Sequence, residues 1–197
     1  MAEKREEKRA ALRERLIDAA EARIADEGLG ALKARDLAAE AGCAVGAIYN
    51  VFEDLNALVM AMNGRTFQAL GARVAASQEG LDCADPHDCL IAMSHAYLGF
   101  AAENTNLWRA LFDLKMSTDT AVPDWYLEEL ARLFAFIHEP LQRLYPGKDA
   151  ADIDLLTRAL FSSVHGIVLL GLEKRISGVP NDRIASMIEI VLREFGP

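Results

Sequence analysis

The stretch Leu32–Phe52 reads LKARDLAAEAGCAVGAIYNVF and determines what fold is expected around it. Apolar residues recur at helical spacing on both sides of Gly42, first at Leu37, Ala38 and Ala41, then at Val45, Ile48 and Phe52. Gly42 interrupts the periodicity, and glycine is the residue that most readily enters a tight turn. The pattern therefore predicts two helices of about two turns each, joined by a tight turn.

A longer helix must support this pair, because helices this short bury too little apolar surface alone. The segment Lys8–Glu27 is predicted to supply it, with a buried stripe at Leu16, Ile17, Ala20 and Ile24. Asp18 and Asp26 face outward in that register. Gly28 and Gly30 are suited to end the helix. Three helices with a sharp second turn form a helix-turn-helix, whose second short helix enters a DNA major groove.

Two motifs in this stretch, RDLAAEAG and GAIYNVF, resemble the DNA-binding domain of the TetR/AcrR family of bacterial transcriptional regulators. The family motif runs from an apolar-Ala pair through an Ala-Gly turn to a Tyr and a closing aromatic residue. These places hold, in order, Leu37-Ala38, Ala41-Gly42, Tyr49 and Phe52, and the resemblance covers Leu12–Leu58 without an insertion. It implies binding to double-stranded DNA at a pseudo-palindromic operator, as a repressor that a small molecule releases.

The chain departs from the family pattern at three positions. Lys33 and Ala44 stand where the family usually has Ser or Thr to cap each short helix, and Leu55 stands where a Lys tends to bind phosphate. A lost N-cap costs about 1 kcal/mol, so we expect each helix start to depend on packing or on bound phosphate. We also expect fewer charged contacts with DNA than is usual in the family.

Eight residues are candidates for contact with DNA: Lys33, Arg35, Ala44, Val45, Gly46, Ala47, Tyr49 and Asn50. The resemblance implies that Arg35 reaches a base or a phosphate, and bidentate Arg–guanine contact is the commonest specific readout. A surface arginine without a DNA contact is the alternative. The small residues, above all Gly46, let the backbone approach base edges closely. The Tyr49 hydroxyl is suited to a phosphate, and Asn50 to adenine or phosphate.

Composition favours an all-α protein. Apolar residues make up 52% of the 197 residues, enough for a substantial core, and no alternating runs of β-branched residues occur. Behind the three front helices, six more are predicted, over Asp54–Gln78, Pro86–Glu103, Asn106–Leu114, Val122–Leu144, Asp149–Arg175 and from the turn Ser177–Pro180 to near Phe195. We therefore predict a helix-turn-helix domain over residues 1–55 and a C-terminal ligand-binding and dimerisation domain over residues 56–197.

The rear half carries a second resemblance. Its segments YLGFAAENTNLWRALFD and SSVHGIVLLGL are similar to a type of C-terminal domain in these regulators that is named for a Trp-His-Gly pattern. His165-Gly166 matches the pattern, and Phe161 is the closest aromatic residue to the expected tryptophan. The resemblance implies that this half binds a small-molecule effector.

A largely apolar effector is expected between the rear helices, because pockets between helices are mostly apolar with a few polar groups. The candidate wall residues are Met62, Phe67, Met93, Tyr97, Trp108, Phe112 and Phe134, with His95 or His165 as a polar contact. A tightly packed core without a cavity would explain the same residues. No cofactor is predicted.

Two apolar stripes predict a homodimer. One comprises Leu160, Val164, Ile167, Val168 and Leu172, and the other Ile184, Met187, Ile188, Val191 and Leu192. Together they exceed what neighbouring helices are expected to cover, and an exposed apolar patch of that size marks an interface. A two-fold dimer would also set two recognition helices one or more DNA turns apart.

The net charge of −9 is unusual for a protein that binds DNA, since non-specific DNA binders are normally basic. Basic residues are nevertheless concentrated near the N-terminus, with glutamates among them, at Lys4, Arg5, Lys8, Arg9, Arg13 and Arg15. They predict either a solvated, salt-bridged helix start or a basic arm that contacts phosphate or the minor groove.

Cysteine usage and hydropathy favour a cytoplasmic protein. The three cysteines, an odd number without regular spacing, indicate a reducing compartment and argue against a disulfide framework. No apolar run is expected to be long enough for a membrane span, and no apolar signal core follows the charged N-terminus. An alternative zinc ligand set has irregular spacing, so no metal site is predicted: Cys83, His87, Cys89 and His95, with Asp85 and Asp88 nearby.

An enzyme is not predicted. The sequence has no glycine-rich phosphate loop, no Gly-x-Ser-x-Gly elbow and no metalloprotease helix motif. The alternative function is a helical ligand-binding dimer whose DNA contacts have weakened or been lost, which the departures at Lys33, Ala44 and Leu55 would explain.

Overall fold

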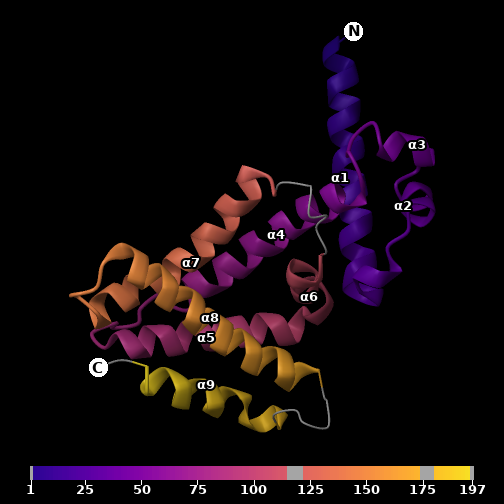
Figure 1. The fold of residues 1–197 in the computed structure, drawn as a ribbon. Coiled ribbons are helices and arrows are strands. Elements are labelled where there is room, and N and C mark those ends of the chain that lie inside the picture. The colour runs from indigo at the N-terminus through magenta and orange to yellow at the C-terminus, as the bar shows by residue number, and fades with distance from the viewer. Residues whose placement is uncertain (1, 115–121, 174–179, 196–197) are drawn as a thin grey trace. The chain divides into compact units, whose positions relative to one another are not determined.

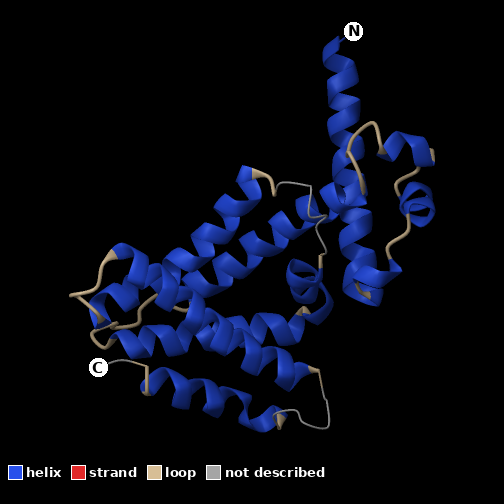
Figure 2. Cartoon of the chain, in the orientation of Figure 1, coloured by secondary structure: helices blue, strands red, loops and turns tan. Residues whose placement is uncertain are grey.

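The computed structural model describes residues 2–114, 122–173 and 180–195, and every regular element in these ranges is a helix (Figure 1, Figure 2). The predicted all-α fold is confirmed. In chain order the α-helices are α1 (Ala2–Glu27), α2 (Ala34–Glu40), α3 (Val45–Ile48), α4 (Leu55–Ala76), α5 (Pro86–Glu103), α6 (Thr105–Asp113), α7 (Asp124–Leu144), α8 (Ala150–Leu172) and α9 (Ile184–Arg193). Two short 3₁₀ helices, η1 (Leu29–Ala31) and η2 (Asn181–Arg183), accompany them.

Side-chain caps determine where two of the long helices begin. The Asp54 carboxylate accepts a hydrogen bond from the Ala57 amide (2.7 Å) at the start of α4. Asp149 accepts one from the Asp152 amide (2.9 Å) at the start of α8. Each cap satisfies an amide that the first helical turn leaves without a partner. The first helix begins at Ala2, earlier than the predicted Lys8.

Parts of two predicted elements lie outside the described residues. These are the end of the helix predicted to reach Arg175, of which the structure describes residues up to 173, and residues 177–179 of the predicted turn. The start predicted for the helix over Val122–Leu144 lies at the edge of a described range, and α7 begins at Asp124.

The described residues form two compact units. Unit 1 comprises Met1–Thr66 and Asn104–Tyr126, and unit 2 comprises Phe67–Glu103 and Leu127–Pro197. Unit 1 thus holds α1, α2, α3 and α6 together with the first half of α4. The boundary predicted at residue 55 separates a DNA-binding part from a ligand-binding part. This functional division stays a prediction.

The core of unit 1 is built on the predicted stripe of α1, whose four residues are each at most 2% exposed. They form one apolar cluster with residues of the following helices: Leu37, Ala38, Ala41, Ile48, Phe52, Leu58, Val59, Met62 and Ala110. The α6 helix is also tied to α1, since the Asn106 side-chain amide donates to the carbonyls of Ala25 (3.0 Å) and Asp26 (3.4 Å). The helix-turn-helix therefore rests on a core to which α4 and α6 contribute.

An ion-pair network joins α1 to α4. Arg65 of α4 contacts three carboxylates of α1, those of Asp18 (2.6 Å), Glu21 (2.9 Å) and Glu14 (2.7 Å). These hydrogen bonds, with that to Asp18 the strongest contribution, raise the pKa of Arg65 above its ordinary value. The groups are partly exposed, so solvent screens the attraction. The network mainly fixes how the two helices are aligned.

In unit 2, α5 packs against α8 and α9, and α8 packs against α9 (Figure 1). Buried apolar residues of this unit come from all three helices, among them Leu90, Phe100, Ile153, Leu160, Val168, Ile188 and Leu192. The α8 and α9 helices approach closely at Gly171, where an added Cβ would overlap Cγ1 and Cδ1 of Ile184. Packing therefore requires a glycine at this position.

The α8 helix corrects the expectation that no apolar run is long enough for a membrane span. Among the described residues, Ala150–Leu172 is long and apolar enough by length and composition, with a mean hydropathy of 1.6 over its best window. A buried core helix passes the same test, so this property alone assigns no membrane. Only 28% of that window is buried in the chain, and Leu155 and Leu170 are exposed large apolar residues of α8.

Gly171→Ala should destabilise the protein. The added methyl group overpacks the α8–α9 contact, which typically costs about 1–3 kcal/mol and exceeds the gain in helix propensity. Ile184→Val removes the Cδ1 atom and should cost about 0.5–1.5 kcal/mol alone. Chemical unfolding of both single variants and the double variant measures their coupling. The double variant should lose less than the sum of the two single losses; additive losses would show that Gly171 does not contact Ile184 as described.

Candidate nucleic-acid interface and ligand site

The turn between α2 and α3 has the geometry that the sequence predicts. Gly42 has a φ of 65°, in the left-handed region that glycine tolerates. The Cys43 amide donates to the carbonyl of Ala38 (2.9 Å), which closes the turn. Leu37 of α2 and Ile48 of α3 are fully buried against α1. The orientation of α3 is therefore fixed by the turn and by the α1 core together.

Two arginines of α1 hold the motif through contacts within the chain. Arg15 Nε donates to the carbonyl of Ala41 (3.1 Å) at the end of α2. Arg9 Nε donates to the carbonyl of Asn50 (3.2 Å) just after α3, and Arg9 also pairs with Glu6 (3.7 Å). Neither sequence-based alternative for these basic residues included this role. These contacts attach the ends of α2 and α3 to the supporting helix α1.

The residues predicted to contact DNA form an exposed face of α2 and α3. Seven of the eight are exposed, and Ala47 is partly exposed. Val45 is 40% and Tyr49 is 51% exposed, which is high for side chains of their type. Among the described residues, the charged groups of Lys33 and Arg35 have no hydrogen bond or ion pair. This predicted DNA-contacting face is therefore available to a partner outside the chain.

The starts of α2 and α3 lack side-chain caps, as predicted, since neither Lys33 nor Ala44 makes a capping hydrogen bond. Gly46 lies inside α3, and an added Cβ there would meet no atom within 4 Å. Neither packing nor backbone conformation therefore requires this glycine. Glycine inside a helix costs about 1 kcal/mol, a cost that close approach by an external partner would explain.

Arg23 of α1 neutralises acidic groups beside the predicted DNA-contacting face. It forms an ion pair with Glu40 of α2, lies 3.9 Å from Asp36, and pairs with Glu27 at 3.1 Å. The hydrogen bond to Glu40 is the main reason that the pKa of Arg23 is raised. The two α2 carboxylates thus have a positive partner, which lowers the negative potential that DNA would meet. The protein's net negative charge is therefore a poor guide to this face.

The nine residues predicted to contact a ligand are divided between the two units. Met62, Trp108 and Phe112 lie in unit 1, where Met62 is part of the apolar cluster around α1 and the Trp108 and Phe112 rings meet edge to face with centroids 5.7 Å apart. Unit 2 contains the other six: Phe67, Met93, His95, Tyr97, Phe134 and His165.

Three of the six form an aromatic group in unit 2. The Tyr97 hydroxyl lies 2.7 Å from His165 Nδ1, so the two side chains share a hydrogen bond. Phe161 stacks on His165 with ring centroids 5.5 Å apart, and Phe134 meets Phe161 edge to face at 5.2 Å. Burial lowers the pKa of His165, which favours the neutral imidazole. These ring contacts and the Tyr97–His165 hydrogen bond join α5, α7 and α8.

Two further candidates on α5, His95 and Met93, lie in different surroundings. His95 Nε2 lies 3.2 Å from Glu189 Oε1 of α9. Met93 lines an open pocket of about 700 Å³ in unit 2. Its remaining walls come from the α4–α5 connection, α5 and α7: Gln78, Cys83, Cys89, Arg132, Ala135, Phe136, Glu139, Pro140 and Arg143.

Sequence analysis missed Asn63, which is fully buried on α4. Its side-chain amide donates to the carbonyl of Ala110 (3.0 Å) and to the Tyr126 hydroxyl (3.2 Å). Its carbonyl Oδ1 has no hydrogen-bond partner among the residues that the structure describes. Burial raises the pKa of Tyr126. The sequence signal for this residue is an Asn-Gly pair within the apolar segment of α4. Apolar periodicity takes no account of such a polar residue.

Family comparisons agree with this geometry. Residues 16–62 match the family described as bacterial regulatory proteins of the tetR family. Residues 90–195 match the tetracyclin repressor-like C-terminal domain, and this match alone covers more than half of the chain. The chain belongs to the TetR family of bacterial regulatory proteins. The N-terminal match contains the whole α2–α3 motif, and the resemblance predicted for both halves is confirmed. No curated protein matches the sequence.

Solved structures share the TetR fold along nearly the whole chain. A protein of unknown function from Rhodococcus sp. RHA1 has a TM-score of 0.72 and 23% identity, covering 92% of this chain and 93% of that one. The transcriptional regulator FadR from Bacillus subtilis, in complex with stearoyl-CoA, has a TM-score of 0.66 and 18% identity (91% and 95% covered). RolR in complex with resorcinol has a TM-score of 0.67 and 22% identity (94% and 89% covered). These likenesses show a shared fold.

In this TetR-family chain the alternative zinc ligands have other partners. Cys83 and Cys89 are joined in a disulfide, which corrects the expectation drawn from the odd number of cysteines. The two ring nitrogens of His87 lie 2.8 Å from Asp85 Oδ1 and 3.1 Å from the carbonyl of Phe195. The residues that the structure describes contain no cluster of metal-ligating side chains. Spacing in the sequence did not reveal that the two cysteines meet across one turn.

The two apolar stripes predicted for dimerisation are largely buried inside unit 2. Six of their ten residues are at most 6% exposed: Leu160, Val164, Val168, Ile184, Ile188 and Leu192. The premise that neighbouring helices leave both stripes uncovered was therefore wrong, because α5, α8 and α9 cover one another. The open apolar positions of these helices are others, namely Leu155 (67% exposed), Leu170 (45%) and Ile190 (64%).

Proposed function

We propose that this TetR-family protein is a cytoplasmic transcriptional repressor that binds a pseudo-palindromic operator as a homodimer and is released by a small, largely apolar molecule. One observation carries the DNA-binding part of the proposal. The face formed by α2 and α3 is rigidly supported from α1, yet Arg35, Val45 and Tyr49 are exposed on it and Arg35 lacks a partner among the described residues.

The chemistry of this face suits a duplex more than a protein partner. Small residues at Ala44, Gly46 and Ala47 let the α3 backbone approach base edges, while the Tyr49 hydroxyl is placed for a phosphate. Arg35 supplies the planar donor pair that guanine recognition uses. Few positive charges are available, so shape and hydrogen bonds contribute more of the affinity than phosphate neutralisation.

The ligand part of the proposal is supported by the open pocket of unit 2. Apolar walls from Met93, Phe136 and Pro140 surround a few polar groups, which is the usual composition of a small-molecule site. Met93 is the residue that this pocket shares with the predicted ligand set. FadR and RolR, which share the fold, are complexed with stearoyl-CoA and resorcinol respectively. Both molecules have substantial apolar parts, so acyl and phenolic compounds are reasonable first probes.

The dimer part is supported by the surface that α8 leaves open. Leu155, Ala159, Ser162, Gly166 and Leu170 are exposed or partly exposed at helical spacing on one side of α8. An added Cβ at Gly166 would meet no atom within 4 Å, so the monomer does not require a glycine there. Small residues between two leucines would let a second copy of α8 approach closely, and Ile190 of α9 adds exposed apolar area.

Arg35→Ala should weaken operator binding about tenfold, because one bidentate contact to a base contributes about 1–3 kcal/mol. Tyr49→Phe should weaken operator and non-specific DNA binding alike, since a phosphate contact carries no sequence information. Titration of promoter fragments over a range of salt concentrations measures both. The dependence of log K on log salt should be shallow, because few phosphates are contacted.

Lys148→Ala, which removes one positive charge from unit 2, is the matched control and should bind like the parent protein. If Arg35→Ala and Tyr49→Phe also bind like the parent, the assignment of the DNA-contacting face is wrong. If the parent itself binds no fragment of its neighbouring promoters, the alternative function, a ligand-binding dimer without DNA binding, replaces this proposal.

Leu170→Glu combined with Ile190→Glu should convert the dimer to a monomer, because a dimer would bury both carboxylates without partners. Sedimentation at micromolar concentration measures the change. Leu127→Glu on α7 is the control, since Leu127 is 48% exposed and Leu170 is 45% exposed; it should leave the dimer intact. A parent protein that sediments as a monomer would contradict the interface.

Ala135→Phe should abolish the thermal stabilisation that a pocket ligand produces, because the larger ring fills the space beside Met93 and Phe136. Ala131→Phe, one turn earlier on α7 and also exposed, adds the same ring outside the lining and should retain the shift. The same ligand should reduce operator affinity, because only a difference in affinity between two states can shift their equilibrium. Stabilisation without loss of operator affinity would refute the coupling.

A further inference from the structure

The disulfide of unit 2 lies at an exposed bend between two helices. Cys83 belongs to the α4–α5 connection, and Cys89 lies in the first turns of α5, six residues later in sequence. Their Cα atoms are 5.6 Å apart, within the usual range for a disulfide. Reduction and re-formation of this bond therefore require no large movement of the backbone.

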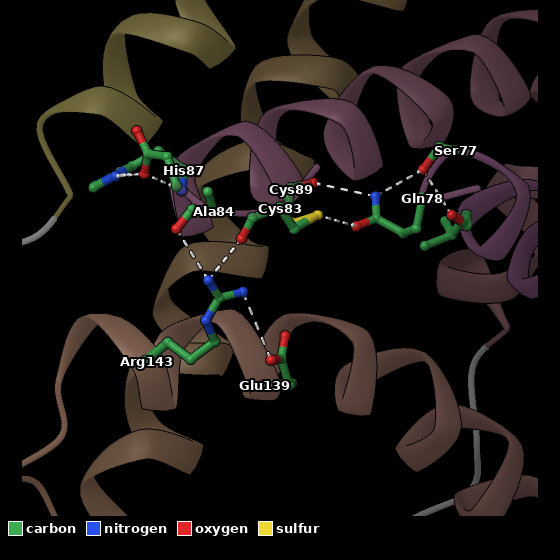
Figure 3. Close-up of a disulfide and its surroundings, with 10 residues drawn as sticks. Ser77, Gln78, Cys83, Ala84, His87, Cys89, Glu139 and Arg143 are labelled. Carbon is green, nitrogen blue, oxygen red and sulfur yellow. Dashed lines mark hydrogen bonds and ion pairs between the residues drawn. A yellow bond between two sulfur atoms is a disulfide. The ribbon is translucent and has the colours of Figure 1, made fainter. Parts of the chain in front are cut away.

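The two sulfur atoms differ in access, and both border the open pocket. Cys89 is 2% exposed, while Cys83 is partly exposed and its Sγ lies 3.4 Å from Gln78 Oε1 (Figure 3). Both residues line the pocket of about 700 Å³, and a small thiol or disulfide can reach the partly exposed Cys83 from solvent. The more exposed Cys83 is the sulfur that an external reagent meets first.

The segment between the two cysteines is held by α7 from one side. Arg143 of α7 donates to the carbonyls of Cys83 (2.6 Å) and Ala84 (3.1 Å), and it pairs with Glu139 at 3.8 Å (Figure 3). These bonds fix the backbone on which Cys83 sits, and they depend on the conformation of the bend.

The same segment is held by the end of α9. Arg193 pairs with Asp85 (3.3 Å) and Asp88 (2.5 Å), and the His87 ring contacts the carbonyl of Phe195 (3.1 Å). The bend from Cys83 to Cys89 is therefore the place where α7 and α9 are both fastened to the start of α5. Any change in the freedom of this bend changes how firmly the end of α9 is held.

We propose that Cys83 and Cys89 are a redox-active pair whose oxidation state controls how firmly α9 is fastened to α5. The co-reactant is a low-molecular-weight disulfide, RSSR. The Cys83 thiolate attacks one sulfur of RSSR, a mixed disulfide forms, and one RS⁻ leaves and takes up the Cys83 proton. The Cys89 thiolate then displaces the second RS⁻, which takes up the Cys89 proton. Two electrons and two protons pass from the protein to RSSR, giving the protein disulfide and two RSH.

Reduction has a defined structural consequence. Without the cross-link the bend gains conformational freedom, and the contacts of Arg193 and His87 must order it alone. The end of α9 should then open more often. Because α9 carries Ile190, transmission of this change to the homodimer would be a further step, and that step alone rests on the proposed function.

Thiol counting and hydrogen exchange on the full-length protein test the proposal without DNA. Cys43→Ser serves as the background, because Cys43 is the free cysteine. After equilibration in glutathione buffers of increasing reducing strength, alkylation and mass spectrometry should show two thiols appearing together in a single two-electron transition. Amides of residues 184–195 should exchange faster in the reduced protein. The melting temperature should fall by about 5 °C on reduction, as expected for loss of a short cross-linked loop.

The control is the same background with Cys83→Ser and Cys89→Ser, which should show neither transition nor redox-dependent exchange. Two thiols that stay reactive in fully oxidised glutathione would overturn the pair itself. A disulfide that forms without changing the melting temperature or exchange in residues 184–195 would overturn its control of α9. Neither outcome bears on operator binding, so failure here is distinguishable from failure of the proposed function.

Discussion

Two helices as short as α2 and α3 bury too little apolar surface to keep a fixed geometry, so their orientation depends on the apolar stripe of α1. Leu16, Ile17, Ala20 and Ile24 are at most 2% exposed and supply the surface on which Leu37 and Ile48 pack. Burial of this kind contributes about 25 cal/mol per Å² of apolar area. The polar contacts are weaker individually, but those of Arg9 and Arg15 select one orientation among those that burial allows.

These internal roles of the basic residues explain how an acidic protein can have a face that is suited to DNA. Several basic groups of α1 are directed at the chain itself, where they donate to backbone carbonyls or pair with the α2 carboxylates. On α3 no charged residue is present, and around α2 the charged groups are Lys33, Arg35 and the two carboxylates that pair with Arg23. The proposal therefore implies little gain from counterion release, and it assigns sequence discrimination to the close fit of small residues on a face that α1 supports.

Local patterns predicted the elements and the motif well, since they depend on nearby residues. Gly42 fixed the turn, and Asp149 precedes α8 as a cap. Contacts between residues far apart in sequence were not predictable, because no local pattern encodes them. Asn106 reaches the end of α1, Arg65 gathers three α1 carboxylates, and Asn63 is buried with an unpaired carbonyl in unit 1. Cys83 and Cys89 meet because a bend brings them together, which cysteine parity does not reveal.

The α8 helix shows the same limit in its apolar faces. Periodicity identifies which residues share a face, but it does not identify the neighbour that covers that face. The stripe containing Leu160, Val164 and Val168 is covered by α5 and α9 within one chain. The side of α8 with Ser162 and Gly166 has a weaker apolar pattern and remains open. Small residues give little hydrophobic signal in a sequence, yet they permit the closest approach of two helices. An interface of this kind is therefore found by asking which surface the folded monomer leaves uncovered, and the strongest apolar stripe is a poor guide to it.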